Sequence, residues 1–129
     1  MALGYVTTLR NTQLDAITTA VGNLGKLAIY DGTRPATGGT ATNKLAEFTL
    51  GSPFAAAASG GVLSPTLPSN VTALLSGTAT WYRITTSGGT FVMDGSAGTS
   101  GTDLILNSAS IASGATVSIT AHTITAGNA

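Results

Sequence analysis

The sequence predicts a mainly β fold: a β-sandwich or jelly-roll-like barrel of about seven or eight short strands, with one short N-terminal helix. Short runs of β-branched and aromatic residues alternate with turns rich in Gly and Ser, and the run 78–86 is the clearest. Helical periodicity is convincing only over residues 12–21. A length of 129 residues suits a single domain, so we expect residues 1–129 to fold as one unit.

The N-terminal segment 1–10 is predicted to be an extended arm, because Tyr5 and Val6 are followed by two Thr residues. A loosely ordered terminus is the ordinary interpretation of such a segment. An arm that docks on a neighbouring subunit is the alternative, and Tyr5 is its candidate anchor.

A helix is predicted over residues 12–22. Thr12 and Asp15 have the spacing of a capping box, and the acid would also lie near the positive end of the helix dipole. Gly22 is expected to end the helix. One apolar stripe is expected to pack on the sheet or on a neighbouring subunit, and it consists of Leu14, Ile17 and Val21.

Residues 26–125 are predicted to form the β-rich body. Its strands are separated by segments of turn-forming residues, such as 32–39 and 95–101. Segment 51–70 carries few strand signals and is expected to be a binding loop or a covered loop. The predicted strands are 27–31, 44–50, 61–64, 71–75, 78–86, 90–94, 102–107 and 115–125.

The chain has very little charge, and this limits the partners that suit it. Charged residues make up 8% of the sequence, against roughly 25% in ordinary soluble domains, and the net charge is +0. Such a surface is better tolerated when partners cover it, which favours a homo-oligomer or a larger assembly. The five basic residues are scattered singly, which argues against nucleic-acid binding.

Membrane insertion and secretion are not expected. No apolar run approaches the ~18–20 residues that a membrane-spanning helix needs. The first residues lack the basic region and the continuous apolar region of a signal peptide, so we expect synthesis in a cytoplasm.

The sequence offers little for catalysis, cofactor binding or metal binding, and we expect a protein that is not an enzyme. It contains no Cys, one His and five carboxylates that lie far apart. His122 is expected to be a packed or surface residue. A calcium site between Asp94 and Asp103 is the weaker alternative, because Asp residues beside Gly-rich turns more often bond the nearby backbone.

Trp81, Tyr82 and Arg83 are the richest cluster of side chains that dominate protein interfaces. Alternation along a strand places Trp81 and Arg83 on one face and Tyr82 on the other. The ordinary interpretation puts Trp81 in the core and leaves Tyr82 half-buried. The alternative is an interface anchor or a sugar-stacking surface. Arg34, in a loop after a strand, is the remaining candidate for partner contact.

Several segments resemble small structural proteins of tailed bacteriophages, and the resemblance covers residues 26–125. It implies a head decoration, cement or minor capsid protein on the capsid surface of the virion. Its partners would be the major capsid protein and copies of itself, as a possible trimer. A tail or baseplate component, or a carbohydrate- or receptor-binding β-sandwich module, remains the alternative. The resembling segments are 28–39, 45–50, 77–84 and 92–96.

Overall fold

The computed structural model describes residues 4–126, which form one helix and twelve strands. Strands account for 37% of the chain and helix for 12%, so the predicted mainly β class with one N-terminal helix is confirmed.

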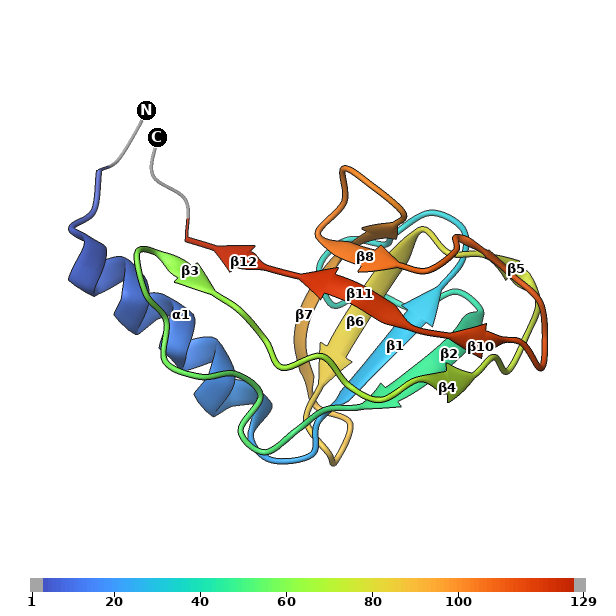
Figure 1. Cartoon of the computed structure of the whole chain (residues 1–129), viewed down its shortest axis with the longest axis horizontal. Helices are drawn as coiled ribbons and strands as arrows, with labels where there is room; N and C mark the ends of the chain where they lie inside the picture. The colour runs from blue at the N-terminus through green and yellow to red at the C-terminus, as the bar shows by residue number, and fades with distance from the viewer. Residues whose placement is uncertain (1–3, 127–129) are drawn as a thin grey trace.

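A six-stranded sheet forms the body of the molecule (Figure 1). Its order is β11-β8-β7-β6-β1-β2, and every neighbouring pair is antiparallel except β7 and β8. These strands are β1 (Lys26–Tyr30), β2 (Lys44–Thr49), β6 (Trp81–Thr85), β7 (Phe91–Gly98), β8 (Leu104–Leu106) and β11 (Ile119–His122).

Three two-stranded ribbons join the sheet. Their strands are only two residues long, because the chain changes partner soon after each pairing begins. The ribbons pair β3 (Val62–Leu63) with β12 (Ile124–Thr125), β4 (Val71–Thr72) with β10 (Thr116–Val117), and β5 (Gly77–Thr78) with β9 (Ser110–Ile111).

The sheet is curled, and its two edges are linked through β4. The Leu74 amide donates to the Leu45 carbonyl of β2 (2.7 Å), and the Ala73 amide donates to the Ala115 carbonyl beside β10 (2.8 Å). In Figure 1 the segment with β10, β11 and β12, coloured red, crosses in front of β6 and β1. The curl therefore wraps the sheet around one enclosed core.

The inner face of the sheet supplies this core. On β1 and β6, Leu27 pairs with Ile84 and Ile29 pairs with Tyr82, and all four side chains are buried. Ala46, Phe48 and Leu50 alternate along the chain and all belong to this core. Other large side chains of this core are Leu45, Phe54, Leu63, Leu104, Leu106, Val117 and Ile119.

Helix α1 (Thr7–Val21) lies beside β3 and holds the loop before it. The predicted stripe is confirmed, because Leu14 and Val21 are buried and Ile17 packs against the core. Gly22 ends the helix with a φ of +70°, and its amide donates to the Thr18 carbonyl. Such a φ suits Gly, which has no Cβ to clash.

The predicted start of the helix is wrong. The helix begins at Thr7, not at residue 12, so residues 7–10 are helical rather than part of an extended arm. Thr12 lies inside the helix and donates to the Thr8 carbonyl. Asp15 accepts from the Ala58 amide across the domain, so no capping box forms. The helix therefore begins without the capping signal from which its start was predicted, since Val6 at the N-cap makes no side-chain cap bond. The remaining part of the predicted arm, residues 1–3, lies outside the described residues.

The predicted strands occur, but some are divided. The expected strand 78–86 is split into β5 and β6, and 115–125 is split into β10, β11 and β12. The last segment pairs in turn with β4, β8 and β3, so one continuous run of β-forming residues becomes three strands. Segment 51–70 is partly a covered loop, since Phe54 is fully buried.

Candidate functional site

The outer face of the sheet carries a second, small cluster built on Trp81. Its ring stacks on Tyr30, directly opposite in the register, with centroids 4.4 Å apart. The indole Nε1 donates to the Asp31 carbonyl and to the Thr42 hydroxyl, each at 3.0 Å. Loop 31–43 therefore covers the indole, which is 1% exposed.

Tyr82 lies on the inner face, in the main core. Its hydroxyl is 3.0 Å from Nε2 of His122 on β11. Burial raises the pKa of Tyr82 and lowers the pKa of His122 to about 4, because a charged ring would lose its hydration. At neutral pH both rings are therefore uncharged, and His122 is the packed residue that the sequence predicts.

Gly95 makes room for the Tyr82 ring. It lies opposite Tyr82 in the β6–β7 register, and a Cβ on it would lie 2.5 Å from Cε1 and 2.7 Å from Cζ of the tyrosine. Only a residue without a side chain fits there, so Gly95 fixes the position of the ring that meets His122.

Arg83 joins two neighbouring strands and one loop. Its Nε donates to Asp94 Oδ1 (2.7 Å) and its Nη2 donates to Asp94 Oδ2 (3.2 Å). Nη2 also donates to the Gly39 carbonyl (2.7 Å), and the guanidinium lies over the rings of Trp81 and Phe91. Charge-assisted, two-point bonds of this kind set geometry as well as energy.

All five carboxylate side chains of the sequence fasten the fold. Asp31 accepts from the backbone and the side chain of Asn43, and Asp103 accepts from the amide and the hydroxyl of Ser96. Asp15, Glu47 and Asp94 accept from Ala58, Lys44 and Arg83 respectively. Asp103 thus bonds the nearby backbone, as expected, whereas Asp94 lies within β7 and bonds the Arg83 side chain and the distant Gly38 amide, so for Asp94 the expectation of a turn residue is wrong. Among residues 4–126, no three His, Cys, Asp or Glu side chains gather closely enough to hold a metal ion.

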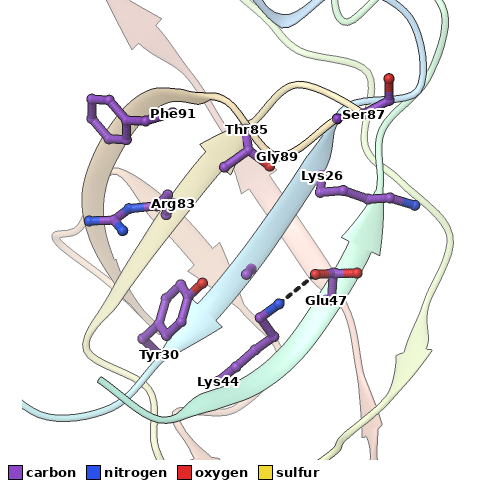
Figure 2. A pocket seen from close by; sticks show the side chains of 11 residues that line it. Lys26, Tyr30, Lys44, Glu47, Arg83, Thr85, Ser87, Gly89 and Phe91 are labelled. Atoms are coloured by element: carbon purple, nitrogen blue, oxygen red, sulfur yellow. Dashed lines mark hydrogen bonds and ion pairs between the residues drawn. The ribbon is translucent and has the colours of Figure 1, made fainter. Parts of the chain in front are cut away.

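A hollow of about 470 Å³ opens on the outer face of the sheet (Figure 2), and we call it the outer hollow. Ala28 contributes the small side chain at the centre of its floor, between Lys26 and Tyr30 of the same strand. Figure 2 shows Tyr30 and Arg83 on one side and Lys44 with Glu47 on the other. Its lining is Lys26, Ala28, Tyr30, Lys44, Glu47, Arg83, Thr85, Ser87, Gly88, Gly89 and Phe91.

Basic residues are concentrated around the outer hollow. Lys26, Lys44 and Arg83 are three of the five basic residues of the chain, and Glu47 is the one acid in the lining. Lys44 Nζ lies 2.7 Å from Glu47, and this bond raises the pKa of Lys44. Lys26 donates to the Thr49 hydroxyl at 2.9 Å. Within the described part of the chain the ion pairs are Lys44–Glu47 and Arg83–Asp94, so Lys26 has no carboxylate partner there.

The five residues predicted to contact partners do not form one site. Arg83 lines the outer hollow, with Trp81 covered beside it, whereas Tyr82 lies on the opposite face. Arg34 is exposed on its loop, and Tyr5 precedes α1 with 36% of its surface exposed. Because Trp81 and Tyr82 are each 1% exposed, neither provides the open ring that a sugar-stacking surface requires. Trp81 is buried as expected, but in the small outer cluster, whereas the expectation that Tyr82 is half-buried is wrong, because its ring lies in the main core.

Lys26, Tyr30 and Lys44 line the outer hollow but were not predicted as site residues. The alternation of side chains along 26–30 carried the signal, because it puts Lys26, Ala28 and Tyr30 on one face. The antiparallel partner strand then adds Lys44 opposite Tyr30, which no single-strand pattern reveals.

Comparison with protein families, with curated proteins and with solved structures finds no significant match to this chain. In the described region, helix α1 lacks the length and apolar character that crossing a membrane would demand.

Proposed function

We propose that the chain is a bacteriophage virion structural protein, a decoration or cement subunit on the capsid surface. It stabilises the head by binding the major capsid protein and copies of itself, and a trimer is one arrangement that would suit this role. The resemblance of segments 28–50 and 77–96 to small phage structural proteins suggests the assembly. The surface of the chain supplies the physical support.

The observation that carries the proposal is a set of exposed apolar side chains on a surface with few charges. Val6 and Leu9, at the start of α1, are 67% and 43% exposed. Leu24 and Leu74 are 54% and 56% exposed, and Leu75 adjoins Leu74. With only 8% charged residues in the chain, little around these side chains opposes association with another protein.

The exposed side of α1 shows the same character. Arg10 and Asp15, its charged residues, bond to the Ala126 carbonyl and the Ala58 amide on the side that faces the domain. Uncharged residues remain for the other side, which suits packing against protein better than solvation alone. They are Thr7, Thr8, Leu9, Thr12, Gln13, Ala16, Thr19 and Ala20.

The carboxylates and the histidine support the same proposal. Each of the five acids fastens a loop, a strand or a cation, and His122 is held neutral in the core. The carboxylates and His122 therefore stabilise the fold, which fits a subunit whose function is to bind other proteins over a large surface. A stable interface buries ~1,200–2,000 Å² in total, and a decoration subunit multiplies that area over many copies.

A deletion and add-back experiment tests the proposal. Phage heads that lack the chain are expected to release their DNA at lower temperature and under milder osmotic shock than complete heads. Adding the purified chain is expected to restore resistance. Heads that are equally resistant without the chain would contradict the cement function, and a defect confined to tail assembly would favour a tail or baseplate role.

A further inference from the structure

We propose that the outer hollow is a docking site for an extended, acidic segment of a partner protein. If the proposed function holds, that partner is a protein of the phage particle. Only the identity of the partner rests on the proposed function. The binding chemistry rests on the charges and the register of β1, β2 and β6.

The charge of the outer hollow selects an anionic ligand. Three cations and one carboxylate line it, and Asp94, which pairs with Arg83, lies beside it. Even with Asp94 counted, one positive charge remains, and Lys26 supplies it. A chain with a net charge of +0 thus places uncompensated positive charge at one concave surface. An acidic segment of a partner would therefore be attracted to this surface.

The register spreads the cations along the outer hollow. Lys26 and Tyr30 are four residues apart on β1, a distance of about 13 Å at the usual rise of a strand. Lys44 pairs with Tyr30 at one end, and Arg83 pairs with Ala28 in the middle. A ligand that meets all three cations must therefore carry carboxylates along a length of about four extended residues.

The shape of the outer hollow favours a chain segment over a small molecule. Sites for small molecules usually enclose most of the ligand between largely apolar walls. Here Lys44 and Glu47 are about two-fifths exposed, with side-chain values of 41% and 37%. The turn Ser87–Gly89 at one end is exposed and has small side chains, so a passing backbone can approach it closely.

The test uses acetylated hexaglutamate as the probe, titrated into the full isotope-labelled chain at low salt. We expect saturable amide shifts in β1, β2 and residues 86–90, and weaker binding as salt increases. Hexaglutamine is expected to leave these amides unchanged. Shifts located elsewhere, or no saturable binding at millimolar peptide, would overturn the proposal.

Two matched variants separate the outer hollow from general charge. Lys26→Glu is expected to weaken hexaglutamate binding by about three- to tenfold, because an attraction becomes a repulsion at an exposed site. Arg34→Glu makes the same change in net charge outside the lining and is expected to weaken binding by less than about twofold. Equal losses in both variants would contradict a local site.

A small dicarboxylate tests whether the outer hollow binds an acidic chain segment or any small anion. Glutarate, compared at equal carboxylate concentration, is expected to bind much more weakly than hexaglutamate. Equal binding would replace the docking site with a small-anion site. If the Lys26→Glu variant binds phage heads as completely as the unchanged chain, the docking inference is overturned and the decoration function stands. If the chain binds hexaglutamate at the outer hollow but is absent from phage heads, the docking site stands and the decoration function is overturned.

Discussion

The two faces of strands β1 and β6 are made from alternate residues of the same short segments, yet they differ in chemistry. Inward, Leu27, Ile29 and Ile84 form an apolar core in which Tyr82 is bonded to one histidine. Outward, Tyr30, Trp81 and Arg83 form a small covered cluster next to an open, basic hollow. The same two strands therefore present two chemically distinct surfaces.

The first prediction compares the loss of stability when a phenylalanine is removed from each face of the sheet. Phe48 is fully buried on the inner face, so Phe48→Ala is expected to lower the free energy of unfolding by about 3–5 kcal/mol. Phe91 is half-buried at the outer hollow, and Phe91→Ala is expected to cost about 1 kcal/mol. Urea unfolding measures both. Equal costs for Phe48→Ala and Phe91→Ala would contradict the distinction. If Phe48→Ala fails to fold, Phe48→Leu is compared with Phe91→Leu instead, and the inner variant is again expected to lose more stability.

The second prediction concerns pH and the inner face. The pKa of His122 is about 4 in the folded chain and about 6.5 when the chain is unfolded, so the unfolded chain binds more protons between these values. Stability is therefore complete above pH 6.5 and falls as pH decreases towards 4, by about 3 kcal/mol in all.

Unfolding free energies measured from pH 7 to pH 4 test this. The variant His122→Gln removes the titrating group, retains an acceptor for Tyr82 and is expected to lose most of the slope between pH 6.5 and 4. The difference between the two slopes measures the contribution of His122. Identical slopes would show that His122 is not held neutral.

The third prediction compares two glycines. Gly95→Ala places a Cβ against the Tyr82 ring on the inner face and is expected to cost about 1–3 kcal/mol, because the ring must shift in a packed core. Gly88→Ala lies in the turn beside the outer hollow, with its nearest neighbouring atom 3.9 Å from the added Cβ. Thermal unfolding is expected to show a change within about 0.5 kcal/mol for Gly88→Ala.

The fourth prediction concerns Leu24, which is exposed and has a φ of +55°. This conformation costs an L-residue about 1 kcal/mol relative to Gly, so Leu24→Gly is expected to stabilise the isolated chain by up to that amount. The same change removes an exposed apolar side chain from the proposed contact surface, so binding to heads is expected to weaken. Leu24→Asn, which tolerates the conformation and is polar, is the companion variant. If Leu24→Gly lowers the stability of the chain, the claim that the positive φ of Leu24 is strained is contradicted.

The sequence was sufficient for features that depend on local pattern. Alternation located the strands around Phe48 and Ile84, and the apolar stripe of Leu14 and Val21 identified the buried side of α1. The start of α1 was not predictable locally, because Val6 at its N-cap makes no side-chain cap bond and its first turn contains no acidic residue.

The candidate site was harder to predict for the same reason. The outer hollow depends on the pairing of Tyr30 with Lys44 and of Ala28 with Arg83, which are long-range contacts. The burial of Trp81 depends on loop 31–43 folding back over it. Neither the pairing nor the loop position has a local signature, so Arg83 was predicted only with its sequence neighbours Trp81 and Tyr82, and Lys26, Tyr30 and Lys44 were missed.

The most direct test of the proposed function is the number and position of copies of this chain in the phage particle that carries it. Quantitative mass spectrometry would give the ratio of the chain to the major capsid protein, and a reconstruction of the particle would locate it. We expect a fixed lattice stoichiometry, with the chain on the outside of the capsid. A few copies confined to the tail, or no copies in the particle, would contradict the proposed role as a capsid decoration protein.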